Sequence, residues 1–167
     1  MTIRIAEPSD APLIEELAIR IWWAHYPEIV SNEQIAYMLE RGYSVPALQQ
    51  QMAEGQVFRI IYSESGDAIG YISISCKSPG SYFIHKFYVD TQQQGKGIGV
   101  AVFQQVLNSY PDLQELRLVV NRRNYRSINF YFKVGFTIEF CLDTPIGEGF
   151  SMDDFQMLWK RPNTPLH

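Results

Sequence analysis

A glycine-rich turn between a strand-like and a helix-like segment constrains this chain more than any other feature. Residues 94–99 read Gln-Gly-Lys-Gly-Ile-Gly, so glycine takes three of the last five positions. Inside a regular element each glycine costs up to about 1 kcal/mol relative to alanine. Glycines are favoured where the backbone turns sharply beside a ligand, and the N–H groups that open the next helix then attract an anion such as phosphate. An ordinary flexible turn is the alternative on spacing alone.

Two common phosphate-binding motifs do not fit this turn. A Walker loop needs Ser or Thr after Gly-Lys, but Gly97 follows Lys96. A dinucleotide fingerprint needs its third glycine at position 100, which is Val100, and its first glycine directly after the strand. Residues 90–94 intervene instead. Neither class explains the turn.

The spacing of apolar residues predicts the order strand, helices, three strands, helix, strand, helix, two strands. An initial strand at 2–5 leads to a helix that starts near Asp10 and closes before Pro27. The later elements are expected at 31–42, 45–53, 57–62, 68–75, 82–89, 96–109, 116–120, 124–133, 136–142 and 154–160. This order predicts a mixed α/β domain with one central sheet, covering 1–161, and a C-terminal tail at 162–167.

Charge and composition exclude several classes of protein. The 167 residues carry a net charge of −4, whereas nucleic-acid binders usually show a basic excess. The sequence therefore predicts no nucleic-acid role, although Arg122, Arg123 and Arg126 leave a local polyanion site open. No stretch reaches the ~20 apolar residues of a membrane span, so no membrane association is expected.

Cysteine and histidine positions indicate neither a disulfide framework nor a metal centre. Cys76 and Cys141 fit no metal spacing, and His25, His85 and His167 share no local metal motif. The N-terminus has no cationic start followed by a long apolar run, so it does not read as a signal peptide. A reducing cytoplasm is the expected location.

Two segments, in the expected order and spacing, resemble signatures of the GNAT family of N-acetyltransferases. Residues 94–99 are similar to its Q/R-x-x-G-x-G/A signature, and residues 124–136 to N-x-x-A-x-x-x-Y-x-x-x-G-F, with Ser127 in place of alanine. Residues 85–90 resemble the strand that precedes the first signature. The resemblance implies one GNAT domain whose mixed, mostly antiparallel sheet has about six or seven strands flanked by helices.

The resemblance also implies a binding site for acetyl-CoA. The strand backbone at Phe87, Tyr88 and Val89 would pair with the pantetheine arm. Asn124 would contact the cofactor, and Arg122, Arg123, Arg126 and Lys133 are candidates for the 3′-phosphate. The pyrophosphate would lie on the turn amides, with Val100 just behind the residues Gln94, Gly95, Lys96, Gly97, Ile98 and Gly99.

In the family's chemistry, Tyr131 would be the general acid for the coenzyme A thiolate. His85 is a candidate base, because an imidazole can accept a proton near neutral pH, although a structural histidine is the alternative. Val119 stands where certain relatives carry a catalytic glutamate, which indicates a base elsewhere or a water chain. A core position is the alternative for Tyr131.

The acceptor is expected to be a small amine. Aromatic residues in the first helices could form a cation box or simply belong to the core, and Asp143, Glu148, Asp153 and Asp154 could bind ammonium or form a solvated loop. The segment from Ser31 to Ser44 is similar to the spermidine and spermine branch, which implies a polyamine. Peptide N-termini, protein lysines and aminoglycosides are alternative acceptors.

A non-catalytic acyl-CoA sensor and a partner-binding module are the other functions left open. A homodimer is also expected.

Overall fold

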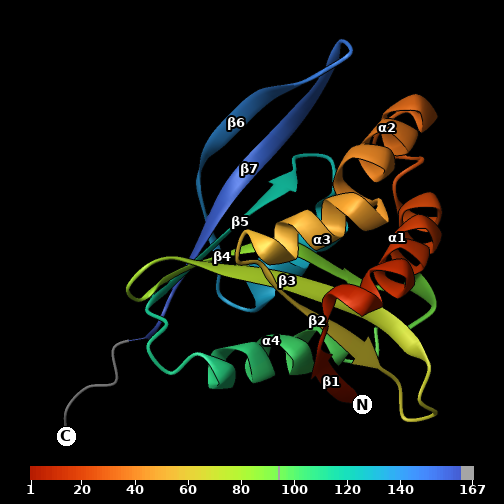
Figure 1. The fold of residues 1–167 in the computed structure, drawn as a ribbon. Helices are drawn as coiled ribbons and strands as arrows, with labels where there is room; N and C mark the ends of the chain where they lie inside the picture. The colour runs from red at the N-terminus through yellow and green to blue at the C-terminus, as the bar shows by residue number, and fades with distance from the viewer. Residues whose placement is uncertain (94, 163–167) are drawn as a thin grey trace, which may run out of the picture. The chain divides into compact units, whose positions relative to one another are not determined.

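Seven strands form one sheet in the computed structural model, which describes residues 1–93 and 95–162. The strand order is β1-β2-β3-β4-β5-β7-β6 (Figure 1). β4 and β5 pair in parallel, whereas β1–β2, β2–β3, β5–β7 and β6–β7 are antiparallel. The predicted α/β fold with a mixed, mostly antiparallel sheet is therefore confirmed. The strands are β1 (Thr2–Ile5), β2 (Val57–Tyr62), β3 (Ala68–Ser78), β4 (Ser81–Val89), β5 (Glu115–Asn121), β6 (Thr137–Gly147) and β7 (Phe150–Lys160).

The chain forms two compact units. The first contains residues 1–75 and 85–105, and the second contains residues 76–84 and 106–167. β3, β4 and helix α4 (Ile98–Ser109) each contribute to both units. The predicted division into a domain at 1–161 and a tail at 162–167 stays a prediction, and residues 163–167 lie outside the described part of the chain.

Three helices of the first unit lie together on one side of β2 and β3 (Figure 1). They are α1 (Ala11–His25), α2 (Asn32–Tyr43) and α3 (Val45–Ala53), and α3 has the predicted bounds. Short 3₁₀ turns at Pro8–Asp10 and Thr91–Gln93 precede α1 and follow β4. The Ser31 hydroxyl accepts a hydrogen bond from the Gln34 amide at 3.1 Å, which fixes the start of α2 as its sequence predicts.

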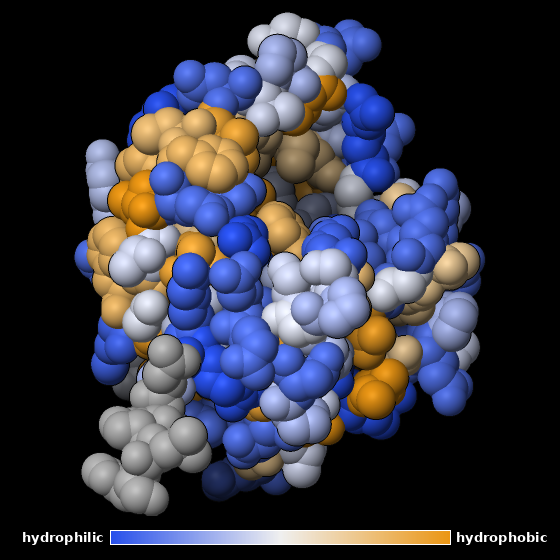
Figure 2. Space-filling view, turned by 90° about the vertical axis from the view of Figure 1, so that its left-hand side faces the viewer, coloured by the Kyte–Doolittle hydropathy of each residue, from blue (hydrophilic) through white to orange (hydrophobic). Residues whose placement is uncertain are grey.

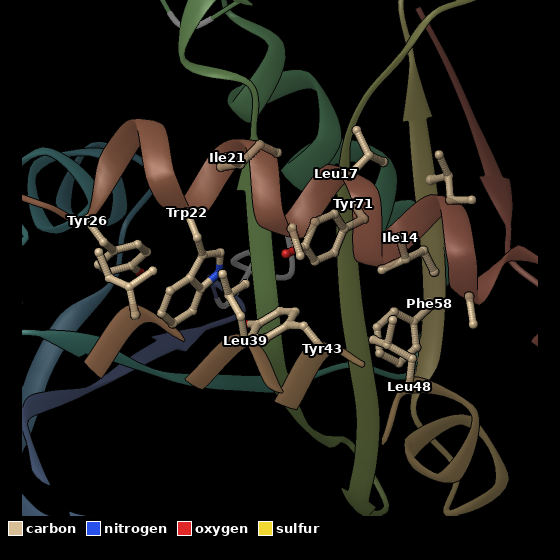
Figure 3. Close-up of a cluster of buried hydrophobic side chains, with 14 of the residues drawn as sticks. Ile14, Leu17, Ile21, Trp22, Tyr26, Leu39, Tyr43, Leu48, Phe58 and Tyr71 are labelled. Carbon is tan, nitrogen blue, oxygen red and sulfur yellow. The ribbon is translucent and has the colours of Figure 1, made fainter. Parts of the chain in front are cut away.

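The core of the first unit follows from the helical spacing of apolar residues in α1. Its buried residues recur three or four positions apart, which places them on one face. They pack on the sheet at Phe58, Ile60 and Tyr71, with Leu39 and Leu48 from α2 and α3 (Figure 3). The buried residues of α1 are Ala11, Ile14, Leu17, Ala18, Ile21 and Trp22. No described helix is long and apolar enough to cross a membrane.

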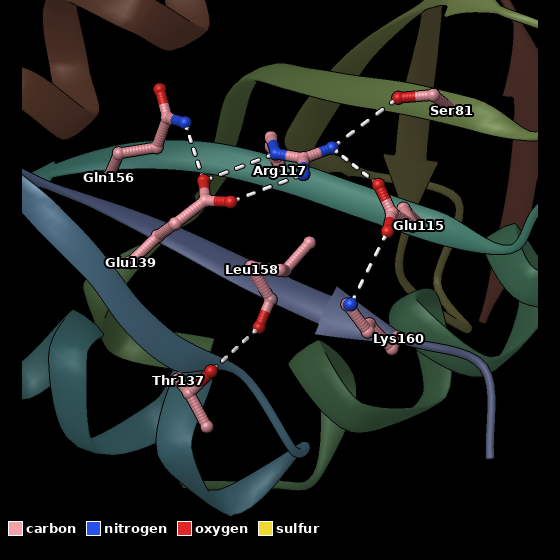
Figure 4. A network of polar contacts seen from close by, with 8 residues as sticks. All are labelled: Ser81, Glu115, Arg117, Thr137, Glu139, Gln156, Leu158 and Lys160. Carbon is pink, nitrogen blue, oxygen red and sulfur yellow. Dashed lines mark hydrogen bonds and ion pairs between the residues drawn. The ribbon is translucent and has the colours of Figure 1, made fainter.

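In the second unit, alternation in the strands separates a buried face from a polar face. Leu116, Leu118 and Val120 of β5 are buried, as are Met157 and Trp159 of β7. The polar face carries a network centred on Arg117, whose guanidinium hydrogen-bonds Glu115 and Glu139 (Figure 4). Helix α5 (Tyr125–Lys133) adds Ile128 and Tyr131 to the buried side chains.

The β6–β7 hairpin is longer than its sequence predicts. β6 continues to Gly147 instead of ending near Leu142, and β7 begins at Phe150 instead of Asp154. The turn residues Glu148 and Gly149 have φ values of 51° and 76°, as a two-residue hairpin turn of type I′ requires. Edge strand β6 is exposed along most of its length. Figure 2 views the molecule from the left-hand side of Figure 1, and on this face hydrophobic residues lie among hydrophilic ones.

Candidate active site

The glycine turn leads directly into α4 in the first unit. Gly95 and Gly97 have φ values of 84° and 76°, a conformation that other residues adopt at a cost. No atom of the described residues lies within 4 Å of a Cβ built on either glycine, so the turn has open space on that side. The Gly97 carbonyl accepts the first helical hydrogen bond, from Ala101 at 3.1 Å. α4 therefore begins at Ile98, two residues after the predicted start.

This turn has the properties of a phosphate cradle. The N–H groups of the first helical turn, at Ile98, Gly99 and Val100, have no partner within the helix by α-helical geometry. They carry the partial positive charge of the helix N-terminus, and Lys96 adds a full charge beside them. The Lys96 ammonium donates to the Gln93 side chain at 2.9 Å. The residues present thus fit a pyrophosphate, while the prediction for Gln94 lies outside the described residues.

The predicted pantetheine segment, Phe87 to Val89, forms the end of β4. Gly70 of β3 lies against it so closely that a Cβ at Gly70 would lie 2.3 Å from the Tyr88 carbonyl oxygen. The Val89 Cα would be 3.0 Å away. A glycine at this position therefore sets how closely the backbone at Tyr88 approaches β3.

His85 is held by a hydroxyl group of the neighbouring strand. Its Nε2 lies 2.7 Å from the Ser75 Oγ. Ser75 and Tyr71 are four residues apart in β3 and share one face, and the Tyr71 ring contacts Tyr88 with ring centroids 5.5 Å apart. His85 and Tyr88 are three positions apart, so strict alternation in β4 would place them on opposite faces. Their contacts with Ser75 and Tyr71, which share a face of β3, indicate that β4 departs from strict alternation between them.

The second unit contains the other predicted signature in the form of α5. Asn124 precedes the helix, and its Oδ1 accepts a hydrogen bond from the Ser127 amide at 3.2 Å. The asparagine is buried, with 4% of its surface exposed. It therefore caps the helix, and its predicted cofactor contact stays a prediction.

Tyr131 is buried in α5 among aromatic side chains. Its ring centroid lies 5.4 Å from that of Phe130 and 5.5 Å from that of Phe136. Burial raises the pKa of the phenol above its ordinary value, so the side chain keeps its proton at physiological pH. Within the described residues its hydroxyl makes no hydrogen bond, which leaves the proton available to a bound group.

The match to known proteins agrees with these two structural signatures. Residues 28–144 match the model of the acetyltransferase (GNAT) domain, which is more than half of the chain. The chain belongs to the GNAT family. Membership of this family identifies it as an N-acetyltransferase. Uncharacterized N-acetyltransferases of Mycobacterium bovis and Mycobacterium tuberculosis are 26% identical to it over 132 residues, or 78% of this chain and 85% of theirs.

Solved structures share the GNAT fold with this chain at low identity. A PaiA N-acetyltransferase from Thermoplasma acidophilum, in complex with coenzyme A, is 23% identical with a TM-score of 0.76, covering 96% of this chain and 100% of its own. A spermidine N-acetyltransferase chimera from Vibrio cholerae and hSSAT is 20% identical with a TM-score of 0.70, covering 95% and 94%. These likenesses confirm the fold.

The aromatic residues of this GNAT chain's first helices form core packing. Trp22, Tyr26 and Tyr43 are 3%, 9% and 5% exposed, and the Trp22 and Tyr26 rings stack with centroids 4.3 Å apart. The Tyr43 hydroxyl donates to the Tyr88 hydroxyl at 3.3 Å. The interpretation of these three residues as core is confirmed. The alternative, a cation box open to ligand, does not describe side chains so thoroughly covered by protein.

The candidate 3′-phosphate contacts have different surroundings. Arg122 donates to Asp143 at 2.5 Å and lies 3.9 Å from Asp153, so its charge is already matched. Lys133 is exposed at the last residue of α5, at the opposite end of the helix from Asn124. These contacts with phosphate stay predictions.

One half-buried and one buried charged side chain, Lys86 and Asp154, escaped the sequence analysis as individual residues. Lys86 of β4 places its ammonium 4.7 Å from the Tyr43 ring centroid and 5.9 Å from that of Phe58. Asp154 of β7 is 5% exposed, although its three acidic companions in the sequence are exposed. A charged residue in an alternating strand gives no sequence signal of burial, because the covering atoms come from elsewhere in the fold.

Proposed function

We propose that this GNAT protein transfers an acetyl group from acetyl-CoA directly to a primary amine, with Tyr131 as general acid. The observation that carries the proposal is that each of the two sequence signatures forms the local structure its predicted role requires. The first forms an open, positive-φ glycine turn at the start of α4. The second forms a capped helix that carries a protonated, buried tyrosine.

The chemistry explains why such groups are useful. A primary amine with a pKa near 10.4 is mostly ammonium at pH 7, and removing its proton costs about 4.6 kcal/mol. Its lone pair then attacks the thioester carbonyl, and the departing thiolate needs a proton or a hydrogen-bond donor. A phenol that retains its proton at physiological pH meets that need. Backbone amides beside the thioester would stabilise the oxyanion.

His85 is the proposed base that the sequence favours. Its Nε2 shares a hydrogen bond with Ser75, so one ring nitrogen is positioned by the protein. Either tautomer fits that bond, because a hydroxyl both donates and accepts. A structural role for the imidazole is the competing interpretation.

For the acceptor, we propose a small polyamine-type amine, with peptide or protein amines as the alternative. The similarity of Ser31–Ser44 to the polyamine branch and the fold of the spermidine N-acetyltransferase chimera support the first choice. An acyl-CoA sensor without transfer is the candidate from a different functional class. The presence of Tyr131 at the signature position counts against such a sensor.

The test measures thiol release from acetyl-CoA with polyamines, amino acids, peptides and aminoglycosides. We expect release with one amine class and a kcat about 10²–10⁴-fold lower in Tyr131→Phe, because the proton donor is lost. Tyr125→Phe is the matched control, since Tyr125 lies in the same helix but is 70% exposed. Cofactor binding without release from any acceptor would favour the sensor, and full turnover in Tyr131→Phe would remove the acid role.

The cytoplasmic location and the homodimer are also proposals. Cys76 and Cys141 are exposed free thiols, which suits a reducing compartment. Ile138 and Phe140 are 42% and 46% exposed on edge strand β6, and an exposed apolar edge suits pairing with a second copy.

A further inference from the structure

The glycine turn before α4 is held in place by very little packing. Gly95, Lys96 and Gly97 are exposed, and no atom of the described residues lies within 4 Å of a Cβ built on either glycine. Glycine also loses more conformational freedom than any other residue when its backbone is fixed. A ligand that binds these amides must therefore order the turn, which weakens binding, unless other contacts fix the turn beforehand. At its C-terminal end, the hydrogen bond from the Ala101 amide to the Gly97 carbonyl anchors it to α4.

Asp90 anchors the chain at the other end of this turn. Its N–H donates to the Ile69 carbonyl of β3 at 2.7 Å, which ties the residue to the sheet directly after β4. Its Oδ1 accepts a hydrogen bond from the Gln92 amide at 3.0 Å, and its carbonyl accepts one from the Gln93 amide at 2.9 Å. An aspartate that binds the amide two residues ahead stabilises a turn. Asp90 thereby fixes the 3₁₀ turn that leads to the glycines.

Arg20 of α1 fixes the carboxylate of Asp90 in turn. Its Nε lies 3.3 Å from the Asp90 Oδ2, and its Nη2 donates to the Ala68 carbonyl at 3.1 Å. One guanidinium thus connects α1, the start of β3 and the residue that follows β4. Its positive charge also balances the Asp90 carboxylate, which would otherwise repel an anion bound nearby. At the far end of the 3₁₀ turn, the Gln93 side chain accepts a hydrogen bond from the Lys96 ammonium at 2.9 Å.

We propose that Asp90, supported by Arg20, is a positioning residue that holds the glycine turn in the conformation that receives the pyrophosphate of coenzyme A. This inference rests on the proposed function, in which the amides of the turn bind that group. All of these contacts, from Arg20 to Lys96, lie within the first unit. The turn itself is exposed, so a ligand reaches it from solvent. Backbone N–H groups that are already ordered favour a ligand that carries a pyrophosphate over one that lacks it.

A second arginine–aspartate pair of the first unit provides a matched control. Arg4 and Asp10 form an ion pair of 2.7 Å, and Asp10 also accepts a hydrogen bond from a backbone amide, at 2.8 Å, beside the other 3₁₀ turn. The Arg4 and Asp10 side chains are 49% and 18% exposed, against 48% and 19% for the pair at the glycine turn. α1 follows Asp10 directly, without a glycine turn. Removal of either carboxylate should therefore affect folding alike, whereas only Asp90 should affect coenzyme A binding.

The test compares affinities for coenzyme A and for pantetheine, which lacks the nucleotide and the pyrophosphate. Calorimetry measures the first Kd, and displacement of coenzyme A by pantetheine measures the second. Asp90→Ala should weaken coenzyme A binding by about tenfold and leave pantetheine binding unchanged. Asp90→Asn should bind coenzyme A within about threefold of the wild type, because an asparagine oxygen replaces the carboxylate as acceptor for the Gln92 amide. Asp10→Ala should leave both affinities unchanged.

Kinetics and the ion pair give two further measurements. With the best amine of the panel, Asp90→Ala should raise the KM for acetyl-CoA and leave kcat unchanged, because the lost contacts affect binding and not the chemical step. Arg20→Met should weaken coenzyme A binding by about threefold in the wild-type background. It should have no effect in the Asp90→Asn background, where no carboxylate remains to be balanced.

The outcomes separate positioning of the turn from a general effect on folding. A coenzyme A affinity of Asp90→Ala within about threefold of the wild type would overturn the proposal. Equal losses of coenzyme A and pantetheine affinity, or the same coenzyme A loss in Asp10→Ala, would also overturn it. So would a wild type that binds coenzyme A no better than pantetheine, since the turn would then hold no pyrophosphate. If the affinities follow the expected pattern but the wild type acetylates no amine, the proposed transfer has failed and the positioning role stands.

Discussion

The desolvated ammonium group of Lys86 lowers the free energy of unfolding of the protein. Its ammonium lies against the Tyr43 and Phe58 rings, and in the described residues it forms no ion pair or hydrogen bond. The aromatic faces return part of the lost hydration energy through cation–π contacts. Burial nevertheless lowers the pKa of Lys86 to about 8. The charged form is thus disfavoured in the folded chain relative to the unfolded one.

Lys86→Met should stabilise the protein at pH 7 by about 1–3 kcal/mol, since methionine fills similar space without a charge. In the wild type the unfolded chain holds the extra proton between about pH 8 and 10.5, so the free energy of unfolding rises with pH there. The variant lacks this rise. Urea unfolding at pH 7 and pH 10 measures both effects. Lys77→Met, at an exposed position of β3, should change little at either pH, and an equal gain there would contradict the argument.

At the scale of elements, the spacing of β3 from β4 depends on Gly70. A methyl group there would overlap the Tyr88 carbonyl and press on Val89, and both are backbone atoms that cannot rotate away. Gly70→Ala should lower the free energy of unfolding by about 2–3 kcal/mol. It should also weaken coenzyme A binding, because the displaced backbone is the predicted pantetheine segment. Chemical unfolding and calorimetric titration with coenzyme A measure the two effects.

Gly42→Ala is the control for that substitution. Gly42 lies in α2, and no atom of the described residues would meet its Cβ within 4 Å. Alanine is the better helix former, so this variant should gain about 0.5–1 kcal/mol. If both alanine variants were equally stable, steric overlap at Gly70 would not be the reason for the glycine.

Element order was predictable because local signals and tertiary packing agree along most of the chain. Leu116, Leu118 and Val120 alternate in the sequence and are all buried in β5. The β6–β7 hairpin was underestimated because the distal part of β6, Asp143-Thr144-Pro145-Ile146-Gly147, shows no alternation of apolar residues and contains a proline. Its Glu148-Gly149 turn also lacks the Asn-Gly or Asp-Gly pair that signals type I′ turns most strongly.

At the scale of the whole molecule, the two signatures could be located because certain backbone conformations require particular residues. Glycine at positive φ and asparagine at a helix cap leave fixed spacings, so both signatures could be located. Asp154 and Lys86 are different, because their burial arises from segments distant in sequence. The irregularity between His85 and Tyr88 likewise has no proline or glycine to mark it. The sequence therefore locates the glycine turn and the helix cap, whereas the burial of individual charged side chains leaves no signal in it.

Coenzyme A should stabilise the whole chain if the turn before α4 binds its pyrophosphate. At 100 times Kd, linkage adds about 2.7 kcal/mol, which raises Tm by about 5–10 °C for a chain of this length. Gly97→Val should lower the Tm of the ligand-free protein, because valine is strained at φ 76°, and should remove most of the coenzyme A shift. Gly66→Val carries the same strain in the β2–β3 turn, at φ 89° and with equally open surroundings, so it should keep the full shift. Differential scanning calorimetry with and without coenzyme A compares the variants. An intact shift in Gly97→Val would place the pyrophosphate elsewhere.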